Sequence, residues 1–406
     1  MTTLTPLTGL LAAVDAEQMA ATVQALAGPR FAGRRAGSPG GAAARAWLAD
    51  RLAALGARVN TAPFAVRAVP EIYAAPQAAW HDGGREYRLT FGRQMLPHVA
   101  SAELPSIRRG DLAVAGTGDP AGRWLLVPAG MSLFDAYGQA QDAAGLLIGR
   151  GTDPDGWHYT MLAGPDPGPL PMLSLDLQTH ARMTAAAGSG WLAASAPIRR
   201  ADVTAGNVHA DWDSGTEILL TAHYDGVGDH PGLRHPSGSD NASGVAVVLE
   251  SSRVLAAALP PGVGLSVALL DAEEVGALGS AHHAAQLRQA GATPLVINVD
   301  GAGRLEDTAA IEAGGPAHGL LAALDQAGRH TGLPLKAGPV ASDNRRYAAA
   351  GLATVGIGAG MGGYHSPADT PDRVEAATLA AVCRLVVATV WLAATTPTKL
   401  SSLIGD

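Results

Sequence analysis

The sequence of 406 residues is poor in cysteine, aromatic residues and charge. Its single cysteine, Cys383, cannot form an internal disulfide, so a disulfide-stapled fold is excluded. Aromatic residues make up 4% and charged residues 16%, while 51 glycines predict tight turns and a core of small side chains. A formal net charge of −8 argues against nucleic acid and anionic membranes as partners.

The chain also lacks a basic residue before its first apolar patch, MTTLTPLTGLLAAV. A secretory signal peptide needs such a basic region, so the sequence predicts a cytoplasmic protein. The apolar run at residues 376–394 is long enough to raise the question of a membrane helix. Arg384 lies in its middle, where a charge is costly in a bilayer, so we expect a buried helix there.

Hydrophobic residues make up 47% of the chain, enough for a large core. Three apolar runs in the second half are typical of buried parallel strands: residues 218–220, 265–270 and 295–299. They predict an α/β fold with a mixed, mostly parallel sheet flanked by helices. Composition shifts near residues 70 and 200, which predicts a mostly β insert at residues 70–200 between the two parts of one domain, residues 1–69 and 201–406.

Each of the three runs ends in side chains that bind metal or move protons, namely His223 with Asp225, Glu273 with Glu274, and Asp300. In open α/β sheets, ligands collect beyond the carboxyl ends of the strands. Extended residues two apart point the same way, so Asp225 can lie behind a ligating His223 and fix its tautomer. Two adjacent buried carboxylates repel each other unless a cation lies beside them.

Asp240, which opens a helix, and His365, late in the chain, complete a set of two imidazoles and three carboxylates. Read alone, Asp240 is an ordinary helix N-cap. The full set of nitrogen and oxygen ligands suits zinc, with cobalt or manganese as substitutes. It is too large for one tetrahedral ion and fits two ions that share a carboxylate, which leaves Glu273 as the base for a water between them.

These residues lie in the segments TAHYDG, SGSDNASGV, LLDAEEVGALGS, INVDGAG, SDNRRYAAAG and YHSPADTPD, within residues 217–373. In this combination the sequence resembles the co-catalytic zinc aminopeptidase family, which contains bacterial leucyl aminopeptidases, glutamate carboxypeptidase and the transferrin receptor. FAGRRAGSPGG near the N-terminus is similar to another segment of that family. The resemblance implies a zinc exopeptidase fold.

The same resemblance implies a role for each residue of the set. His223 and Asp300 are expected to hold one zinc ion, Glu274 and His365 the other, and Asp240 to bridge both. Glu273 is expected to be the general base and Asp225 the partner of His223. A cis peptide between Asp240 and Asn241 is also implied.

Two features lie outside this common pattern. The insert, with RWLLVPAG and QDAAGLLIG, is similar to a protease-associated domain, and we expect it to overhang the cleft without supplying a metal ligand. Some family members carry an oxyanion-stabilising tyrosine shortly before the SDNRRY segment. Residues 338–341 are Gly, Pro, Val and Ala here, so either Tyr347 or Tyr364 replaces it or zinc stabilises the oxyanion alone.

The resemblance implies a metal-dependent exopeptidase that hydrolyses N-terminal residues from peptides by a hydroxide bridged between two zinc ions. A carboxypeptidase or dipeptidase, with Arg345 and Arg346 clamping a substrate carboxylate, is the main alternative. A glutaminyl-cyclase-like enzyme and a non-catalytic, receptor-like scaffold are further alternatives. The complete ligand set argues against the scaffold. The sequence leaves the preferred terminal residue, the native metal and the oligomeric state open.

Overall fold

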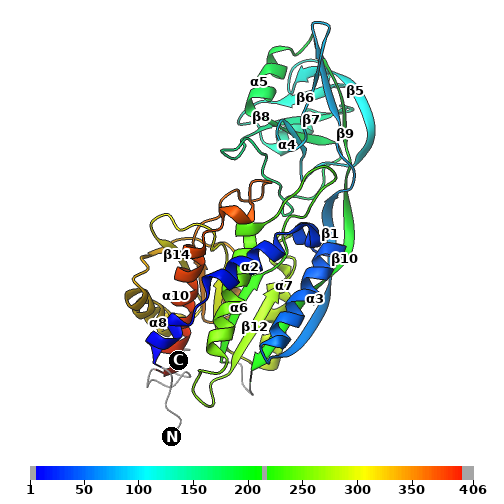
Figure 1. Cartoon of the computed structure of the whole chain (residues 1–406). Helices are drawn as coiled ribbons and strands as arrows, with labels where there is room; N and C mark the ends of the chain where they lie inside the picture. Colours follow the sequence, from blue (N-terminus) through cyan, green and yellow to red (C-terminus); the bar gives the residue numbers. More distant parts are fainter. Residues whose placement is uncertain (1–5, 213–216, 396–406) are drawn as a thin grey trace.

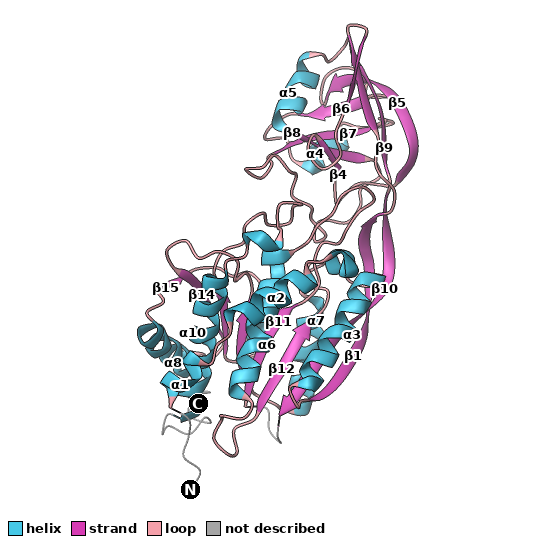
Figure 2. Cartoon of the chain, viewed as in Figure 1, coloured by secondary structure: helices cyan, strands magenta, loops and turns pink. Residues whose placement is uncertain are grey.

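A two-stranded ribbon joins the two lobes of the computed structural model, which describes residues 6–212 and 217–395 (Figure 1). The ribbon pairs β1 (Arg58–Ile72) with β10 (Ile198–Trp212) in antiparallel register along their whole length, interrupted by one irregularity after Val66. The main lobe holds the chain before and after the ribbon, and the insert lobe holds the residues between its strands. Helix α1 (Leu7–Ala12), where the described chain begins, lies at the end of the main lobe remote from the insert lobe (Figure 2).

The main lobe is built on an eight-stranded sheet in the order β1-β10-β12-β11-β13-β16-β14-β15. Its central strands β12, β11, β13 and β16 run parallel, while β10 and β14 pair with them in antiparallel fashion. The remaining strand bounds are β11 (Ile218–His223), β12 (Leu265–Leu270), β13 (Leu295–Val299), β14 (Ala309–Gly314), β15 (Leu335–Ala337) and β16 (Thr354–Gly358).

Helices cover both faces of this sheet, which explains why its central strands are apolar without alternation (Figure 2). Leu220 of β11 joins the core on one face, while its neighbour Leu219 packs on the other. The first face packs against α1 (Leu7–Ala12), α2 (Ala16–Leu26), α3 (Pro39–Ala54), α6 (Ser243–Leu255), α8 (His318–Thr331) and α10 (Ala376–Thr395). The second packs against α7 (Leu278–Ala290) and α9 (Asn344–Ala349). The predicted mixed α/β fold is confirmed.

Helix α10 is the apolar run whose burial was expected from Arg384. Among the described residues it is the one helix long and apolar enough to cross a membrane, yet 72% of its most apolar window is buried inside the protein. It packs against α8 and α6, and Cys383 lies fully buried within it. Arg384 points outward and donates to the carbonyl of Leu11 in α1. The helix is thus part of the main core.

The insert lobe is a second eight-stranded sheet, in the order β3-β2-β9-β5-β6-β7-β8-β4. It carries two short helices, α4 (Leu133–Gly138) and α5 (Leu177–Ala185), on separate apolar clusters. The strand bounds are β2 (Ala78–Asp82), β3 (Arg85–Arg88), β4 (Met95–Pro97), β5 (Leu104–Val114), β6 (Trp124–Val127), β7 (Gly145–Arg150), β8 (Met172–Asp176) and β9 (Trp191–Ala196). Its likeness to a protease-associated domain stays a prediction.

Candidate metal centre

The carboxyl ends of three neighbouring strands supply most of the site. His223 is the last residue of β11, the Glu273–Glu274 pair follows β12, and Asp300 follows β13. Because β11 lies between β12 and β13 and runs parallel to both, these ends meet at one edge of the sheet. The strand-end interpretation of the sequence therefore describes the real geometry.

Asp240 reaches the same edge from η2 (Gly238–Ala242), a π-helical turn before α6. The Asp240–Asn241 peptide is cis, as predicted. The Asn241 amide nitrogen donates to the Val299 carbonyl at 2.9 Å, and its oxygen accepts from the Gly301 N–H at 3.1 Å. A Cβ added at Gly244 would lie 2.5 Å from the Val299 carbonyl oxygen, so glycine is needed for this close approach. Asn241 thus ties the Asp240 turn to the end of β13.

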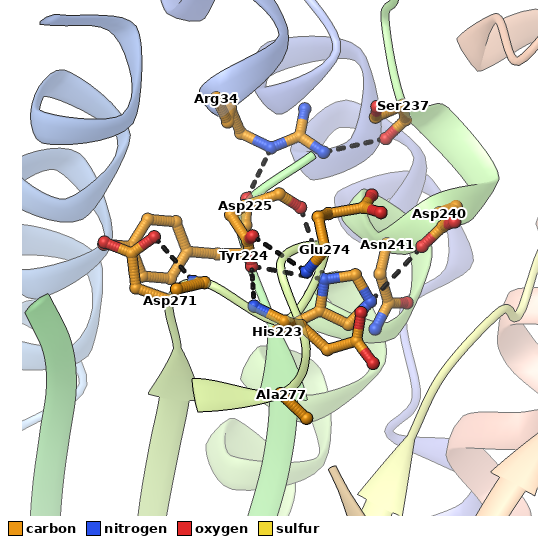
Figure 3. A network of polar contacts seen from close by, with 12 residues as sticks. Arg34, His223, Tyr224, Asp225, Ser237, Asp240, Asn241, Asp271, Glu274 and Ala277 are labelled. Atoms are coloured by element: carbon orange, nitrogen blue, oxygen red, sulfur yellow. Dashed lines mark hydrogen bonds and ion pairs between the residues drawn. The ribbon is translucent and has the colours of Figure 1, made fainter. Parts of the chain in front are cut away.

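Two groups of possible metal ligands share Asp240: His223, Asp240 and Asp300 form one, and Asp240, Glu274 and His365 form the other. One carboxylate oxygen of Asp240 lies 3.2 Å from His223 Nε2 (Figure 3), and the other lies 3.2 Å from His365 Nε2. His223 Nε2 is also 3.3 Å from Asp300 Oδ1. All five side chains are buried. The structure therefore brings the five predicted ligands together, with Asp240 between the two halves.

The donor set fits divalent metal ions. Neither oxygen of Glu274 has a hydrogen-bond partner among the described residues, although Oε2 lies 2.7 Å from His365 Nε2. Burying unpaired carboxylates is costly unless a cation or a hydrogen bond compensates them. Imidazole nitrogens and carboxylate oxygens are the ligands that zinc prefers outside thiolate sites. Three buried carboxylates facing two imidazoles are thus a chemically reasonable cage for such ions.

The electrostatics of the site reflect this crowding. Burial raises the pKa of Glu274 to about 7, and Asp240 adds to the effect while His365 opposes it. Burial also raises the pKa of Glu273 well above 4.5, against the opposing charge of His223. Desolvation alone would lower the pKa of His365, but the charges of Glu274 and Asp240 outweigh this effect and hold the pKa of His365 well above 6.5. Positive charge in the site would therefore stabilise the ionised form of its carboxylates.

Asp225 has a wider role than the sequence suggested. Its Oδ1 lies 3.5 Å from His223 Nδ1, as expected for the partner of a ligating histidine. Its two oxygens also accept hydrogen bonds from the backbone N–H groups of Glu273 (3.0 Å) and Glu274 (3.2 Å). Asp225 therefore holds the end of β11 and the segment after β12 in one arrangement (Figure 3).

Sequence reasoning did not identify two buried residues that shape the site. Arg34, in the FAGRRAGSPGG segment, donates to the carbonyls of Leu26, Tyr224, Pro236 and Ser237. It is fully buried and fixes the loop between His223 and Asp240 (Figure 3).

The second is Asp369, whose carboxylate accepts from the N–H groups of Ser239 (2.6 Å) and Asp240 (3.0 Å). The sequence signal that could have identified Asp369 was its place in YHSPADT, four residues after His365.

The segment of residues 153–161 in the insert lobe contacts the loop that carries His365. The Thr160 N–H donates to the His365 carbonyl at 2.8 Å, and Met161 Sδ lies 3.4 Å from His365 Nδ1. Ser366 donates to Asp153 Oδ2 at 2.6 Å. His365 has a left-handed backbone (φ 50°), a conformation that needs support from its surroundings in a non-glycine residue. Neither ligand group includes an insert residue, but the insert holds the loop that carries His365.

A cavity of about 410 Å³ opens beside Glu273, Glu274 and His365. Tyr364 lines it and stacks on the His365 ring at 3.8 Å, whereas Tyr347 is buried and its hydroxyl lies 2.8 Å from His283 Nδ1. Of the two tyrosines considered from the sequence, only Tyr364 lines this cavity.

Two arginines also line this cavity, and both are already engaged. Arg345 forms an ion pair with Glu312 at 2.8 Å, and Arg346 donates to the Gly276 carbonyl at 2.6 Å. Each arginine is therefore held in place by a partner within the protein.

Comparison with known proteins agrees with this geometry. Residues 207–390 match the model of peptidase family M28, and no curated protein sequence matched the chain. Three solved structures share the fold over nearly the whole of both chains. The aminopeptidase from Aneurinibacillus sp. strain AM-1 is 22% identical, with a TM-score of 0.71 and 97% of each chain covered. BSAP, a zinc aminopeptidase from Bacillus subtilis, is 19% identical, with a TM-score of 0.74, covering 95% of this chain and 96% of that one.

A peptidase M28 precursor from Shewanella amazonensis is 19% identical, with a TM-score of 0.73, and the alignment covers 97% of this chain and 96% of that one. At these identities the structures show the fold alone, while the family match covers every residue of the two ligand groups. The resemblance drawn from the sequence motifs is confirmed, because the match to the model of peptidase family M28 spans residues 207–390 and with them the predicted ligands.

Proposed function

We propose that the protein is a metal-dependent exopeptidase that removes N-terminal residues from peptides. The observation that carries the proposal is the pair of buried ligand groups joined by Asp240, at the edge of the sheet where a cavity opens. The named neighbours with this fold include two aminopeptidases, one of them a zinc enzyme. Zinc at both groups, with Asp240 between, is our assignment for the site.

The residues of the chain divide the work as follows. His223 and Asp300 hold one ion, Glu274 and His365 the other, and Asp240 both. Bound there, divalent ions supply a Lewis acid for the peptide carbonyl and lower the pKa of water. Glu273 accepts a proton from the attacking water at its carboxylate and passes it to the leaving amine.

Glu273 suits this role by its environment. It lines the cavity beside the ligand groups and belongs to neither of them. Burial raises its pKa, and the nearby carboxylates of Asp343 and Asp300 raise it further. A raised pKa brings a carboxylate closer to the value at which it both accepts and returns a proton near neutral pH. Cations at the ligand groups act in the opposite direction and keep it ionised.

The charge of the cavity favours a substrate with a free amine. Glu273 and Glu274 line it, and its two arginines are engaged by Glu312 and by the Gly276 carbonyl. An N-terminal ammonium is therefore attracted by the two carboxylates. This attraction favours an aminopeptidase over the carboxypeptidase alternative. The complete set of ligands and the candidate base disfavour a receptor-like scaffold.

A substrate panel tests the proposal. Peptides with a free amine should be cleaved from the N-terminus, N-acetylated versions should resist, and C-terminally amidated versions should still lose their N-terminal residue. Removal of metal with a chelator should abolish activity, and zinc or cobalt should restore it. Full activity in protein shown by elemental analysis to be free of metal would overturn the proposal. Release of the C-terminal residue from N-acetylated peptides would replace it with the carboxypeptidase.

A further inference from the structure

A second and larger cavity, of about 620 Å³, lies between the insert lobe and the main lobe. Its apolar wall includes Ile72 and Ile198 from the two ribbon strands and Leu96 from β4, which pack together as one cluster. Cavities of 300–1,000 Å³ with apolar walls and a few polar groups, especially between domains, are the usual form of a ligand site.

This cavity adjoins the candidate metal centre. Met161 and Tyr364 line both it and the smaller cavity beside Glu273. The same two side chains contact His365, Met161 through its sulfur and Tyr364 by ring stacking. A peptide whose first bond lies at the ligand groups can therefore extend past these two shared side chains toward the larger cavity.

The two cavities differ in charge. Among the described residues, no aspartate or glutamate lines the interlobe cavity, and Arg150 does. Arg150 forms no ion pair with a described residue, and its Nη2 lies 3.2 Å from His98 Nε2. The smaller cavity has Glu273 and Glu274 in its wall together with Arg345, which is paired with Glu312, and Arg346. Opposite charges attract, so a carboxylate is drawn to Arg150 in the larger cavity, where no acidic side chain opposes it.

Two buried histidines in the wall of the interlobe cavity have a nitrogen without a partner. His158 and His230 are both more than nine-tenths buried, and Nε2 of each has no hydrogen-bond partner within the described chain. His158 donates to the backbone of Gln94, so its Nε2 is an acceptor. Buried polar atoms are nearly always paired, and a bound peptide N–H is a suitable donor for this one.

We infer that the interlobe cavity binds the part of a peptide substrate that follows its first residue, when that part is apolar and ends in a carboxylate. Leucine-like side chains pack on the wall formed by Ile72, Leu96 and Ile198, and Arg150 pairs with the terminal carboxylate. The inference rests on the proposed function and adds to it the substrate class: short, apolar peptides with a free C-terminus.

Gly151 offers a direct way to fill the cavity. It lines the cavity, and a Cβ at this position meets no atom within 4 Å. A Gly151→Phe variant should therefore place a ring in the cavity without straining the backbone. Gly138, at the exposed end of α4, also has open space around its Cβ and does not line the cavity, so Gly138→Phe is the matched control.

Binding is measured by calorimetry with N-acetyl-leucyl-leucine, which has no free amine for an aminopeptidase to act on, and with its C-terminal amide. The unmodified protein and Gly138→Phe should bind the acid with equal affinity, and Gly151→Phe at least about tenfold more weakly. Arg150→Gln should weaken the acid about tenfold more than the amide, because a charged hydrogen bond is lost. In kinetics, Gly151→Phe should lower kcat/KM for trileucine at least about tenfold more than for leucine p-nitroanilide.

Equal affinity of Gly151→Phe and Gly138→Phe for the acid would overturn the inference, as would equal losses for acid and amide in Arg150→Gln. Either result can occur in a protein that cleaves free-amine peptides, in which case the proposed function stands. Binding as expected in a protein that cleaves none of them would instead overturn the proposed function and leave the cavity assignment intact.

Discussion

Glu273 and Glu274 are neighbours in the chain with different surroundings. Glu274 Oε2 lies 2.7 Å from His365 Nε2, while Glu273 belongs to neither ligand group. We predict that Glu273→Gln lowers kcat by at least about 10²-fold, because the amide cannot accept the proton, with a smaller change in KM. Steady-state kinetics and elemental analysis together test this, and the metal content should be unchanged.

Glu274→Gln is the matched variant one residue away, and it should lose metal as well as activity. A Glu273→Gln protein with normal metal content and near-normal kcat would show that the base lies elsewhere.

Arg34 makes a second prediction at the same scale. Its guanidinium donates to four carbonyls at 2.7–3.1 Å, and Arg34→Met would remove this donor from all of them. We expect a loss of at least about 3 kcal/mol in the free energy of unfolding, measured in urea. Arg30→Met, which removes an exposed arginine over the Phe31 ring, should cost less than about 1 kcal/mol. Similar losses in the two variants would contradict the anchoring role of Arg34.

Glu312 gives a pH-dependent prediction. Burial alone would raise its pKa, but the N–H groups of Ala341 and Val340 and the Arg345 guanidinium lower it from 4.5 to about 2. A carboxylate whose pKa is lower in the folded than in the unfolded protein stabilises the fold at pH values above its unfolded-state pKa. This stabilisation is lost as the pH falls toward the pKa of the folded state. Glu312→Gln should therefore cost about 1–2 kcal/mol at pH 7.

The difference in the free energy of unfolding between Glu312→Gln and the unmodified protein should shrink below about pH 4.5. Urea unfolding at several pH values measures this difference. The exposed Glu306→Gln is the control and should show little effect at any pH. A difference independent of pH would mean that the charge of Glu312 does not stabilise the turn at Val340 and Ala341.

At the scale of elements, the segment at residues 153–161 makes the insert lobe part of the site. Asp153 Oδ1 accepts from the N–H groups of Asp155 and Trp157, and its Oδ2 accepts from Ser366. Asp153→Ala should loosen this segment and with it the loop that carries His365. Groups that orient a metal ligand typically contribute 10–100-fold in affinity, so we expect zinc affinity to fall about tenfold or more in competition with a chelator.

Asp119→Ala provides the control for this element, because Asp119 caps an exposed turn of the insert lobe through the Ala121 N–H. Its zinc affinity should match that of the unmodified protein. Unchanged affinity in Asp153→Ala would show that the main lobe alone positions His365.

The elements that could be predicted from the sequence are those governed by local pattern. Apolar runs followed by His223, Glu274 and Asp300 lead to one edge of the sheet because parallel strands share a direction, so the ligand set could be predicted from the sequence. Contacts between remote segments could not be predicted in this way. Arg34 meets the Tyr224 carbonyl 190 positions later, and Met161 meets His365 across 204 positions. No periodicity or local motif encodes such pairs. The sequence analysis therefore expected the insert to overhang the cleft but did not predict its contacts with the loop that carries His365.

For the whole molecule, the ribbon brings the two ends of the insert lobe side by side, with Ile72 opposite Ile198. The main lobe can therefore form one continuous sheet although about a third of the chain lies outside it. The same arrangement makes β1 an edge strand of that sheet, and its outward side chains include Asn60 and Arg67. Polar and charged residues on an edge strand oppose pairing with other molecules.

This arrangement predicts a solubility effect without a stability effect. The double variant Asn60→Val, Arg67→Val should leave the free energy of unfolding within about 0.5 kcal/mol, because both side chains are exposed. It should increase the insoluble fraction on expression, because exposed apolar edges aggregate. The same substitution type at exposed positions of helix α8, Asp325→Val and Arg329→Val, is the control. Equal insolubility of the two double variants would remove any special role for β1.

The ribbon also imposes a delay during synthesis between the appearance of β1 and that of its partner β10. Val59 pairs with Ala210, so β1 leaves the ribosome well before its partner has been made. At 5–20 residues per second, β1 waits about 8–30 s, and the insert lobe is completed within that interval. All residues of the insert lobe are therefore made while β1 still lacks its partner strand, so the insert is the first lobe of this protein whose chain is complete.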